Sequence, residues 1–64
     1  MKVNGKRVDF KKGENLKEFL ENNKYKIQNI AVECNGNVIL KNDYEKHILS
    51  DKNTYEIVSF VGGG

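Results

Sequence analysis

The apolar residues of the chain follow two different periods, and the change from one to the other divides the sequence into elements. Met1 and Val3 alternate with polar neighbours, as do Val8 and Phe10, and a period of two indicates half-buried strands. Asn4–Gly5 lies between the two runs and favours a type I′ turn, because both central residues of that turn need positive φ. The pattern therefore predicts a hairpin whose second strand reaches Phe10.

A helical period follows the hairpin. Apolar residues at positions i, i+3 and i+4 share one face of a helix, and here they are Leu16, Phe19 and Leu20. Asn15 is a suitable N-cap, and Glu18 has the position of a capping-box carboxylate. Asn22–Asn23 can take the left-handed conformation, so we expect the helix to end there after about two turns. A helix this short is stable only when it packs on the hairpin.

The second half of the chain returns to a period of two. Ile30, Val32 and Cys34 alternate along a third strand, and Asn35–Gly36 offers a tight turn into a fourth strand at 38–40. The segments between regular elements also hold apolar residues that we expect to fold inward, namely Tyr25, Ile27, Ile48 and Leu49. The polar stretch at 41–51 then leads to a last strand.

The last apolar run, Tyr55–Val61, predicts a strand with two different faces. If Tyr55 and Ile57 point into the core, Val58 and Phe60 lie on the opposite face with Glu56, because alternate residues of a strand share a face. Exposed apolar residues of this kind often mark a protein interaction site. The alternative is that Phe60 packs under a loop.

The order of elements is strand, strand, helix, strand, strand, strand. A last strand that follows a polar crossover can lie parallel to the first, at the centre of a mixed sheet. We therefore predict an α+β fold of the β-grasp (ubiquitin-like) type, with a mixed four- to five-stranded sheet and one helix across one face. The domain is expected over 1–61, and a flexible glycine tail over 62–64.

The tail residues Gly62, Gly63 and Gly64 have no side chains to bury, and glycine loses more backbone freedom on ordering than any other residue. We expect them to be mobile and free of contacts. A tail without Cβ atoms can also pass through a narrow channel that excludes larger residues. The tail alone leaves its meaning open between a functional terminus and one without function, either a frayed end or residues left over from expression.

Composition narrows the possible functions. A chain of 64 residues holds one domain with a shallow core and no deep substrate cavity. The net charge of +2 comes from interspersed lysines and acids, so we expect no nucleic-acid binding. No apolar run could span a membrane, and no signal peptide follows Met1.

The single cysteine and the single histidine exclude an internal disulfide and a metal cluster, and both facts fit a reducing cytoplasm. Cys34 occupies a core-facing strand position and is expected to be an inert small apolar side chain. His47 has no second group of the right kind near it in sequence, and we predict a surface histidine.

Together the motifs resemble the ThiS family of sulfur carrier proteins, which have the ubiquitin-like β-grasp fold. The likeness covers essentially the whole chain and rests on Val3–Lys6, Leu16–Leu20, Ile30–Gly36 and Ile57–Gly64. The sequence departs from the family pattern at Leu40–Asn42 and Asp51–Asn53, both in predicted loops.

The resemblance implies a function in thiamine biosynthesis. An E1-like adenylyltransferase (ThiF-like) would use ATP to adenylate the Gly64 carboxylate, and a sulfur donor enzyme would supply a persulfide sulfur that replaces AMP. The Gly64 thiocarboxylate would then pass its sulfur to a ThiG-like thiazole synthase. Gly62 and Gly63 would thread into the partner, and Val58 and Phe60 would form the partner surface. The chain would bind no cofactor and contribute no catalytic residue, so we expect a carrier and not an enzyme.

Other functions share parts of this pattern. A ubiquitin-like modifier would use the same adenylation step but join Gly64 to lysines of target proteins, so covalent conjugates would favour it over a carrier. The sulfur could also go to molybdopterin or to a modified tRNA base. A bare β-grasp interaction module would keep its activity after deletion of Gly63–Gly64, whereas a carrier would lose it.

Overall fold

A computed structural model describes residues 1–60 of the chain. The end of the predicted domain at Val61 and the tail residues Gly62, Gly63 and Gly64 lie outside the described residues. No helix within residues 1–60 is long and apolar enough to cross a membrane. The regular elements are, in chain order, β1 (Lys2–Val3), β2 (Lys6–Arg7), α1 (Leu16–Asn22), the 3-10 helix η1 (Ile27–Asn29), β3 (Ile30–Cys34), β4 (Asn37–Ile39), the 3-10 helix η2 (Lys41–Asp43) and β5 (Thr54–Ser59).

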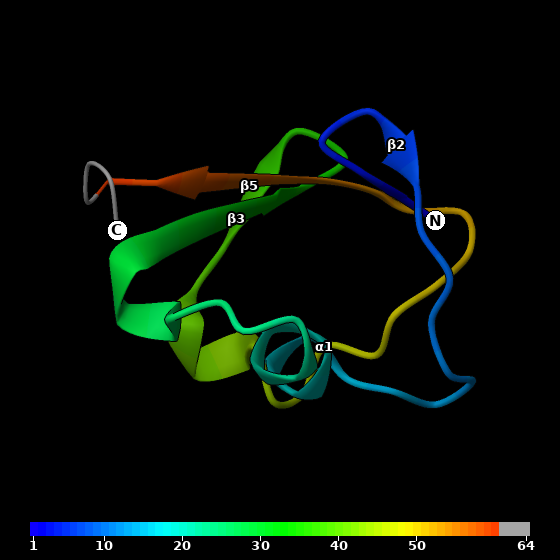
Figure 1. Cartoon of the computed structure of the whole chain (residues 1–64), viewed down its shortest axis with the longest axis horizontal. Coiled ribbons are helices and arrows are strands. Elements are labelled where there is room, and N and C mark those ends of the chain that lie inside the picture. Colours follow the sequence, from blue (N-terminus) through cyan, green and yellow to red (C-terminus); the bar gives the residue numbers. More distant parts are fainter. Residues whose placement is uncertain (61–64) are drawn as a thin grey trace.

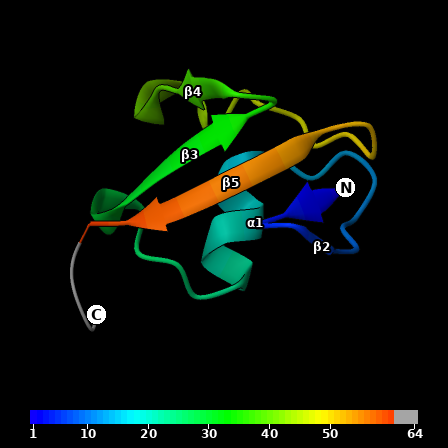
Figure 2. The ribbon, with the colours of Figure 1, turned by 90° about the horizontal axis from the view of Figure 1, so that it is seen from above.

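The strands form one mixed five-stranded sheet in the order β2-β1-β5-β3-β4. β5 runs parallel to β1 and antiparallel to β3, so the last strand lies at the centre of the sheet. α1 crosses one face of the sheet, and no other element of residues 1–60 covers the opposite face (Figures 1 and 2). We call this uncovered side the open face. The predicted β-grasp fold is confirmed.

The first hairpin has the predicted turn, but its second strand is shorter than predicted. Asn4 and Gly5 both have positive φ, 52° and 82°, as a type I′ turn requires. β2 ends at Arg7, however, and the prediction that it reaches Phe10 is wrong. The Val8 N–H still donates to the Met1 carbonyl oxygen at 3.0 Å, after which the chain leaves the sheet and descends toward α1 (Figure 1). Val8 and Phe10 are half-buried against the core.

The predicted start of α1 is confirmed. The Glu18 N–H donates to Asn15 Oδ1 at 2.8 Å and the Asn15 N–H donates to Glu18 Oε1 at 3.2 Å, which completes the capping box. The helix ends at Asn22 with Asn23 as its C-cap, as predicted, but Asn23 has φ −100° and the positive φ of 65° belongs to Lys24. Asn23 instead caps the helix with its side chain, which donates from Nδ2 to the Phe19 carbonyl oxygen at 2.7 Å.

The core fills the space between α1 and the sheet. Tyr25 and Ile27 pack against it from the connector, as predicted. Its buried residues are Met1, Val3, Leu16, Phe19, Leu20, Ile30, Val32, Tyr44, Leu49, Tyr55 and Ile57.

The polar segment after β4 contains one error of prediction and one omission. Leu49 is buried as expected, but Ile48 is 55% exposed. The chain around Ile48 pairs with the start of α1 in an isolated antiparallel bridge to Asn15, and neighbouring residues of an extended segment point to opposite sides. Leu49 therefore faces the core and Ile48 faces outward. Tyr44, which the pattern did not assign to the core, is only 2% exposed.

Candidate functional site

β5 is held along both edges by asparagines of the two Asn-Gly turns. Asn4 Oδ1 accepts from the Ile57 N–H at 2.8 Å, and Asn4 Nδ2 donates to the Ile57 carbonyl oxygen at 3.3 Å. Asn35 Oδ1 accepts from the Thr54 N–H at 3.0 Å, and the Asn35 N–H donates to the Thr54 carbonyl oxygen at 2.8 Å. Because β1 ends at Val3, the Asn4 amide takes the place of a further strand residue beside β5. The direction of β5 is therefore fixed as it approaches the tail.

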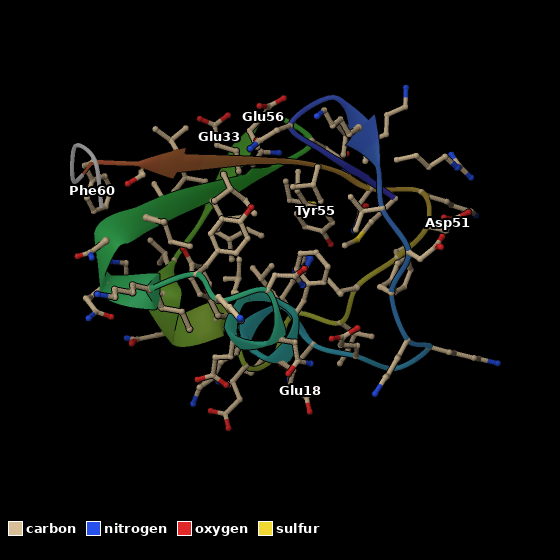
Figure 3. All side chains as sticks on the ribbon, viewed as in Figure 1. Glu18, Glu33, Asp51, Tyr55, Glu56 and Phe60 are labelled. Carbon is tan, nitrogen blue, oxygen red and sulfur yellow. The ribbon has the colours of Figure 1, made fainter. Side chains whose placement is uncertain are left out.

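The side chains of β5 alternate as the sequence predicts. Tyr55 and Ile57 are buried, whereas Val58 is 54% exposed. Glu56 is also exposed and projects from the open face, on the side of the sheet away from α1 (Figure 3). The prediction that two faces of β5 differ is confirmed; the role of Val58 in partner binding stays a prediction.

Phe60 lies at the end of β5 and is 61% exposed, so it does not pack under a loop (Figure 3). Its N–H donates to the Asn29 carbonyl oxygen at 3.1 Å, which extends the pairing with the chain before β3. Lys41 Nζ lies 5.5 Å from the centroid of the Phe60 ring and also donates to the Gln28 carbonyl oxygen at 3.2 Å. A cation over an exposed ring contributes about 0.5–1 kcal/mol, so the ring has a defined neighbour without being buried.

The open face beside β5 has further apolar residues that the sequence analysis did not assign to a partner surface. Ala31 of β3 lies opposite Val58, and Val38 of β4 lies opposite Glu33. Val38 is 65% exposed and Leu40 is 68% exposed. The signal was available in the sequence, because an inward Ile39 requires its neighbours Val38 and Leu40 to point outward.

His47 is half-buried, so the prediction of a surface histidine is wrong. Its Nε2 lies 2.7 Å from the Tyr55 hydroxyl oxygen, which also accepts a hydrogen bond from Asn53 Nδ2 at 3.0 Å. The Tyr55 hydroxyl can donate its own proton to Nε2 of a neutral His47 ring. In this arrangement the hydroxyl, the imidazole nitrogen and the Asn53 amide all have hydrogen-bond partners. Burial lowers the pKa of His47 from its ordinary value of 6.5, which also favours the neutral ring. These hydrogen bonds connect the start of β5 to the segment that precedes it.

The Cys34 thiol does not have the surroundings of a reactive thiol. Cys34 is half-buried and packs against the core. Burial raises its pKa, and the nearby Tyr55 hydroxyl offsets this only in part. A raised pKa keeps the group as a thiol, whereas a nucleophile or a metal ligand would need the thiolate. Within residues 1–60, no group of three or more His, Cys, Asp or Glu side chains could hold a metal ion.

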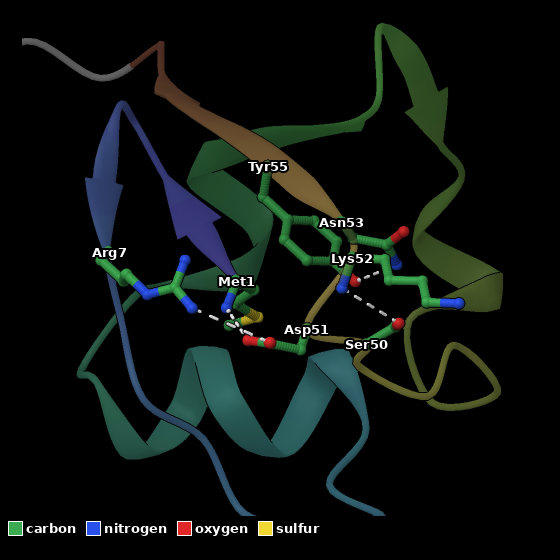
Figure 4. A network of polar contacts seen from close by, with 7 residues as sticks. All are labelled: Met1, Arg7, Ser50, Asp51, Lys52, Asn53 and Tyr55. Atoms are coloured by element: carbon green, nitrogen blue, oxygen red, sulfur yellow. Dashed lines mark hydrogen bonds and ion pairs between the residues drawn. The ribbon is translucent and has the colours of Figure 1, made fainter.

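A charged cluster lies at the opposite end of β5 and consists of the Met1 ammonium, Arg7 and Asp51 (Figure 4). The Met1 ammonium nitrogen lies 2.7 Å from Asp51 Oδ1, and Arg7 Nη2 lies 3.8 Å from Asp51 Oδ2. Hydrogen bonding and charge from the Met1 ammonium, with the charge of Arg7, lower the pKa of Asp51. This cluster fixes the loop that leads into β5, at the far end of the strand from Phe60.

Comparison with known proteins identifies relatives of the whole chain. The family model described as the ThiS family matches residues 1–64. A crystal structure of the thiamine biosynthesis protein ThiS from Geobacter metallireducens is 30% identical, with a TM-score of 0.77 and coverage of 98% of this chain and 96% of that chain. An NMR solution structure of a thiamine biosynthesis protein from the same organism is 32% identical, with a TM-score of 0.77 and coverage of 98% and 85%. None of the curated proteins compared with the sequence matches it.

Proposed function

The chain belongs to the ThiS family, the sulfur carriers of thiamine biosynthesis, and we propose that its residue Gly64 carries the sulfur as a thiocarboxylate. The observation that carries this proposal is the family match over residues 1–64, which includes the glycines at 62–64. The described domain agrees with such a role, because β5 leads directly toward these glycines and is held on both sides.

The chemistry begins with a carboxylate, which is a poor electrophile because its charge is spread over two oxygens. An E1-like, ThiF-like enzyme joins a Gly64 carboxylate oxygen to the α-phosphorus of ATP and releases pyrophosphate. The terminal sulfur of a cysteine persulfide on a sulfur donor enzyme then attacks the acyl carbon and expels AMP with that oxygen. A second thiol cleaves the resulting acyl disulfide, which leaves the Gly64 thiocarboxylate and a disulfide. We infer that the sulfur then passes to a ThiG-like thiazole synthase.

The chain itself contributes a surface that binds the adenylating enzyme and a C-terminal tail that enters its active site. Gly62 and Gly63 offer no Cβ and can thread into the active site of the adenylating enzyme, while Val58 and Phe60 contact its surface. The partners supply the catalytic groups, a proposal that fits the protonated Cys34 thiol and the engaged His47 ring. ATP is consumed by the partner, which suits a reaction in the cytoplasm.

Intact mass spectrometry tests this function. The chain is incubated with ATP, a persulfide source, a thiol and the ThiF-like enzyme from the same organism. We expect a mass gain equal to the exchange of one oxygen for sulfur, located at Gly64 by fragmentation. Deletion of Gly63–Gly64 should abolish the exchange. Formation of lysine conjugates in place of a free thiocarboxylate would identify a modifier and contradict the carrier function.

A further inference from the structure

Two glutamates lie directly opposite each other on the open face. Glu33 of β3 and Glu56 of β5 are directly opposite in the antiparallel register, and both project away from α1 (Figure 3). Side chains of directly opposed residues on one face begin about 5 Å apart, and like charges in this arrangement destabilise a sheet. The register between β3 and β5 therefore places two like charges side by side on this face.

No cation of the described chain compensates this pair. Within residues 1–60, neither Glu33 nor Glu56 forms an ion pair or a hydrogen bond through its carboxylate. Lys2 of the neighbouring strand β1 lies opposite Thr54, two residues before Glu56 on β5. Arg7 contacts Asp51 instead, at 3.8 Å.

The surroundings of the pair are apolar and exposed. Val38 lies opposite Glu33 on one side, and Val58 and Ala31 form the next row toward the end of β5. Val38 is 65% exposed and Val58 is 54% exposed. A protein that covers these side chains also removes water from the two carboxylates, and carboxylates without water need a cation with hydrogen-bond donors.

We propose that Glu33 and Glu56 together receive one arginine of the adenylating enzyme, set within an apolar surface that covers Val38 and Val58. A guanidinium has five donors in a planar fork and can bind two carboxylates at once, and arginine is enriched at protein interfaces. The inference rests on the proposed function, because it names what the docking surface of that enzyme must contain. The carboxylate pair makes the open face selective, since a partner with an acidic or purely apolar surface leaves the two charges buried without a counterion.

Substitutions of Glu33 and Glu56 distinguish an effect on enzyme binding from an effect on the stability of the fold. Glu33→Gln and Glu56→Gln keep the shape of the side chain and remove the repulsion, so the melting temperature should rise or stay unchanged. Each variant should bind the ThiF-like enzyme more weakly, and the double variant by about thirtyfold or more. Glu21→Gln is the matched control, because Glu21 is an exposed acid on α1, which covers the other face. It should change neither quantity.

Glu33→Lys gives the sharpest contrast. The new ammonium lies opposite Glu56 and forms an ion pair within the chain, which should raise the melting temperature while it abolishes binding. A purely structural role would move stability and affinity in the same direction. Binding is measured by titration calorimetry at about 50 and about 200 mM salt, and the wild-type affinity should fall more steeply with salt than that of the double variant.

Three results would overturn the inference. If the wild type acquires sulfur while the Gln variants bind the enzyme as tightly as it does, the proposed function stands and the arginine contact is wrong. If the variants instead lose binding only to the thiazole synthase, or only self-association, the named occupant is wrong. If the wild type neither binds the enzyme nor acquires sulfur, the proposed function and the inference fail together.

Discussion

At the scale of single residues, the two buried tyrosines of the core have hydroxyls in opposite situations. The Tyr55 hydroxyl is 2.7 Å from His47 Nε2 and accepts from Asn53 Nδ2, so its hydrogen-bonding capacity is used. The Tyr44 hydroxyl is equally buried but has no hydrogen-bond partner within residues 1–60. Burial raises the pKa of both tyrosines. We therefore expect the Tyr55 hydroxyl to raise the free energy of unfolding and the Tyr44 hydroxyl to lower it.

The variants Tyr44→Phe and Tyr55→Phe test this difference. A buried polar group without a partner is destabilising by about 1–3 kcal/mol, so Tyr44→Phe should leave the free energy of unfolding unchanged or raise it. Tyr55→Phe leaves His47 and Asn53 without their partner and should lower the free energy of unfolding by roughly 1–2 kcal/mol. Urea denaturation of both variants measures the two values. A loss of equal size for Tyr44→Phe would show that its hydroxyl has a partner.

His47 predicts a dependence of stability on pH. Burial lowers its pKa from 6.5, so between the folded and unfolded values the unfolded chain binds more protons. This contribution to the free energy of unfolding is complete above pH 6.5 and is lost as the pH falls through that window toward the folded value. Asp51 acts at lower pH, because its pKa lies below its ordinary 3.8.

The test compares the wild type with His47→Gln by urea denaturation between about pH 7.5 and about pH 5. The wild type should lose stability on acidification over this range, and the variant, which has no imidazole to titrate, should show a much smaller slope. An equal slope in both proteins would assign the effect to another group.

At the scale of elements, sequence patterns predicted correctly the features that neighbouring residues decide. They failed for features that depend on contacts with distant parts of the chain. Asn15 and Glu18 form the predicted capping box, because a cap is decided by neighbours within one turn. The alternation in β3 and β5 placed Ile57 and Val58 on the correct faces. The inward Ile48 was wrong because an isolated bridge to Asn15, far away in sequence, sets its direction.

The site was predicted in the same uneven way. The exposure of Val58 follows from the period of two and is confirmed, and Phe60, just beyond the end of β5, is exposed as well. The opposed pair of Glu33 and Glu56 could not be predicted, because it depends on the register between β3 and β5, which no local pattern fixes. The residue that holds β5 beyond the end of β1, Asn4, was recognised only as part of a turn.

Asn4 should therefore stabilise β5 as well as the turn. Asn4→Gly keeps a residue suited to the φ of 52° but removes both hydrogen bonds to Ile57. We expect a loss of about 1–2 kcal/mol in the free energy of unfolding and faster amide exchange of the Ile57 N–H. Lys24→Gly is the control, since Lys24 also has positive φ, 65°, and glycine there should be neutral or stabilising. Unchanged protection of Ile57 in Asn4→Gly would contradict this role.

At the scale of the whole molecule, the two faces of the sheet differ in what covers them. α1 and the connectors bury one face and provide the stability, while the open face keeps Val38 and Val58 exposed beside a strand that leads to the tail. The charged cluster at Met1 and Asp51 closes the opposite end of the sheet. Stability and partner binding should thus respond to different substitutions along β5, although the residues are neighbours in sequence.

Substitutions at three positions of β5 and its end test this separation. Phe60→Ala removes an exposed ring and a contact with Lys41, so it should lower the free energy of unfolding by less than about 1 kcal/mol. Val58→Ser should have a similarly small effect. Ile57→Ala empties part of the core and should lower the free energy of unfolding by about 2–4 kcal/mol. Thermal and urea denaturation give these values, and calorimetry with the ThiF-like enzyme gives the affinities.

The variants that lose the most affinity for the ThiF-like enzyme should be those that lose the least stability. Phe60→Ala and Val58→Ser should weaken binding to the adenylating enzyme and slow the appearance of the thiocarboxylate, because the docking surface is reduced while the fold is intact. Ile57→Ala, measured well below its melting temperature, should bind almost as well as the wild type, since its side chain is only 9% exposed. A large fall in melting temperature for Phe60→Ala, with unchanged affinity, would make Phe60 part of the core and remove it from the partner surface.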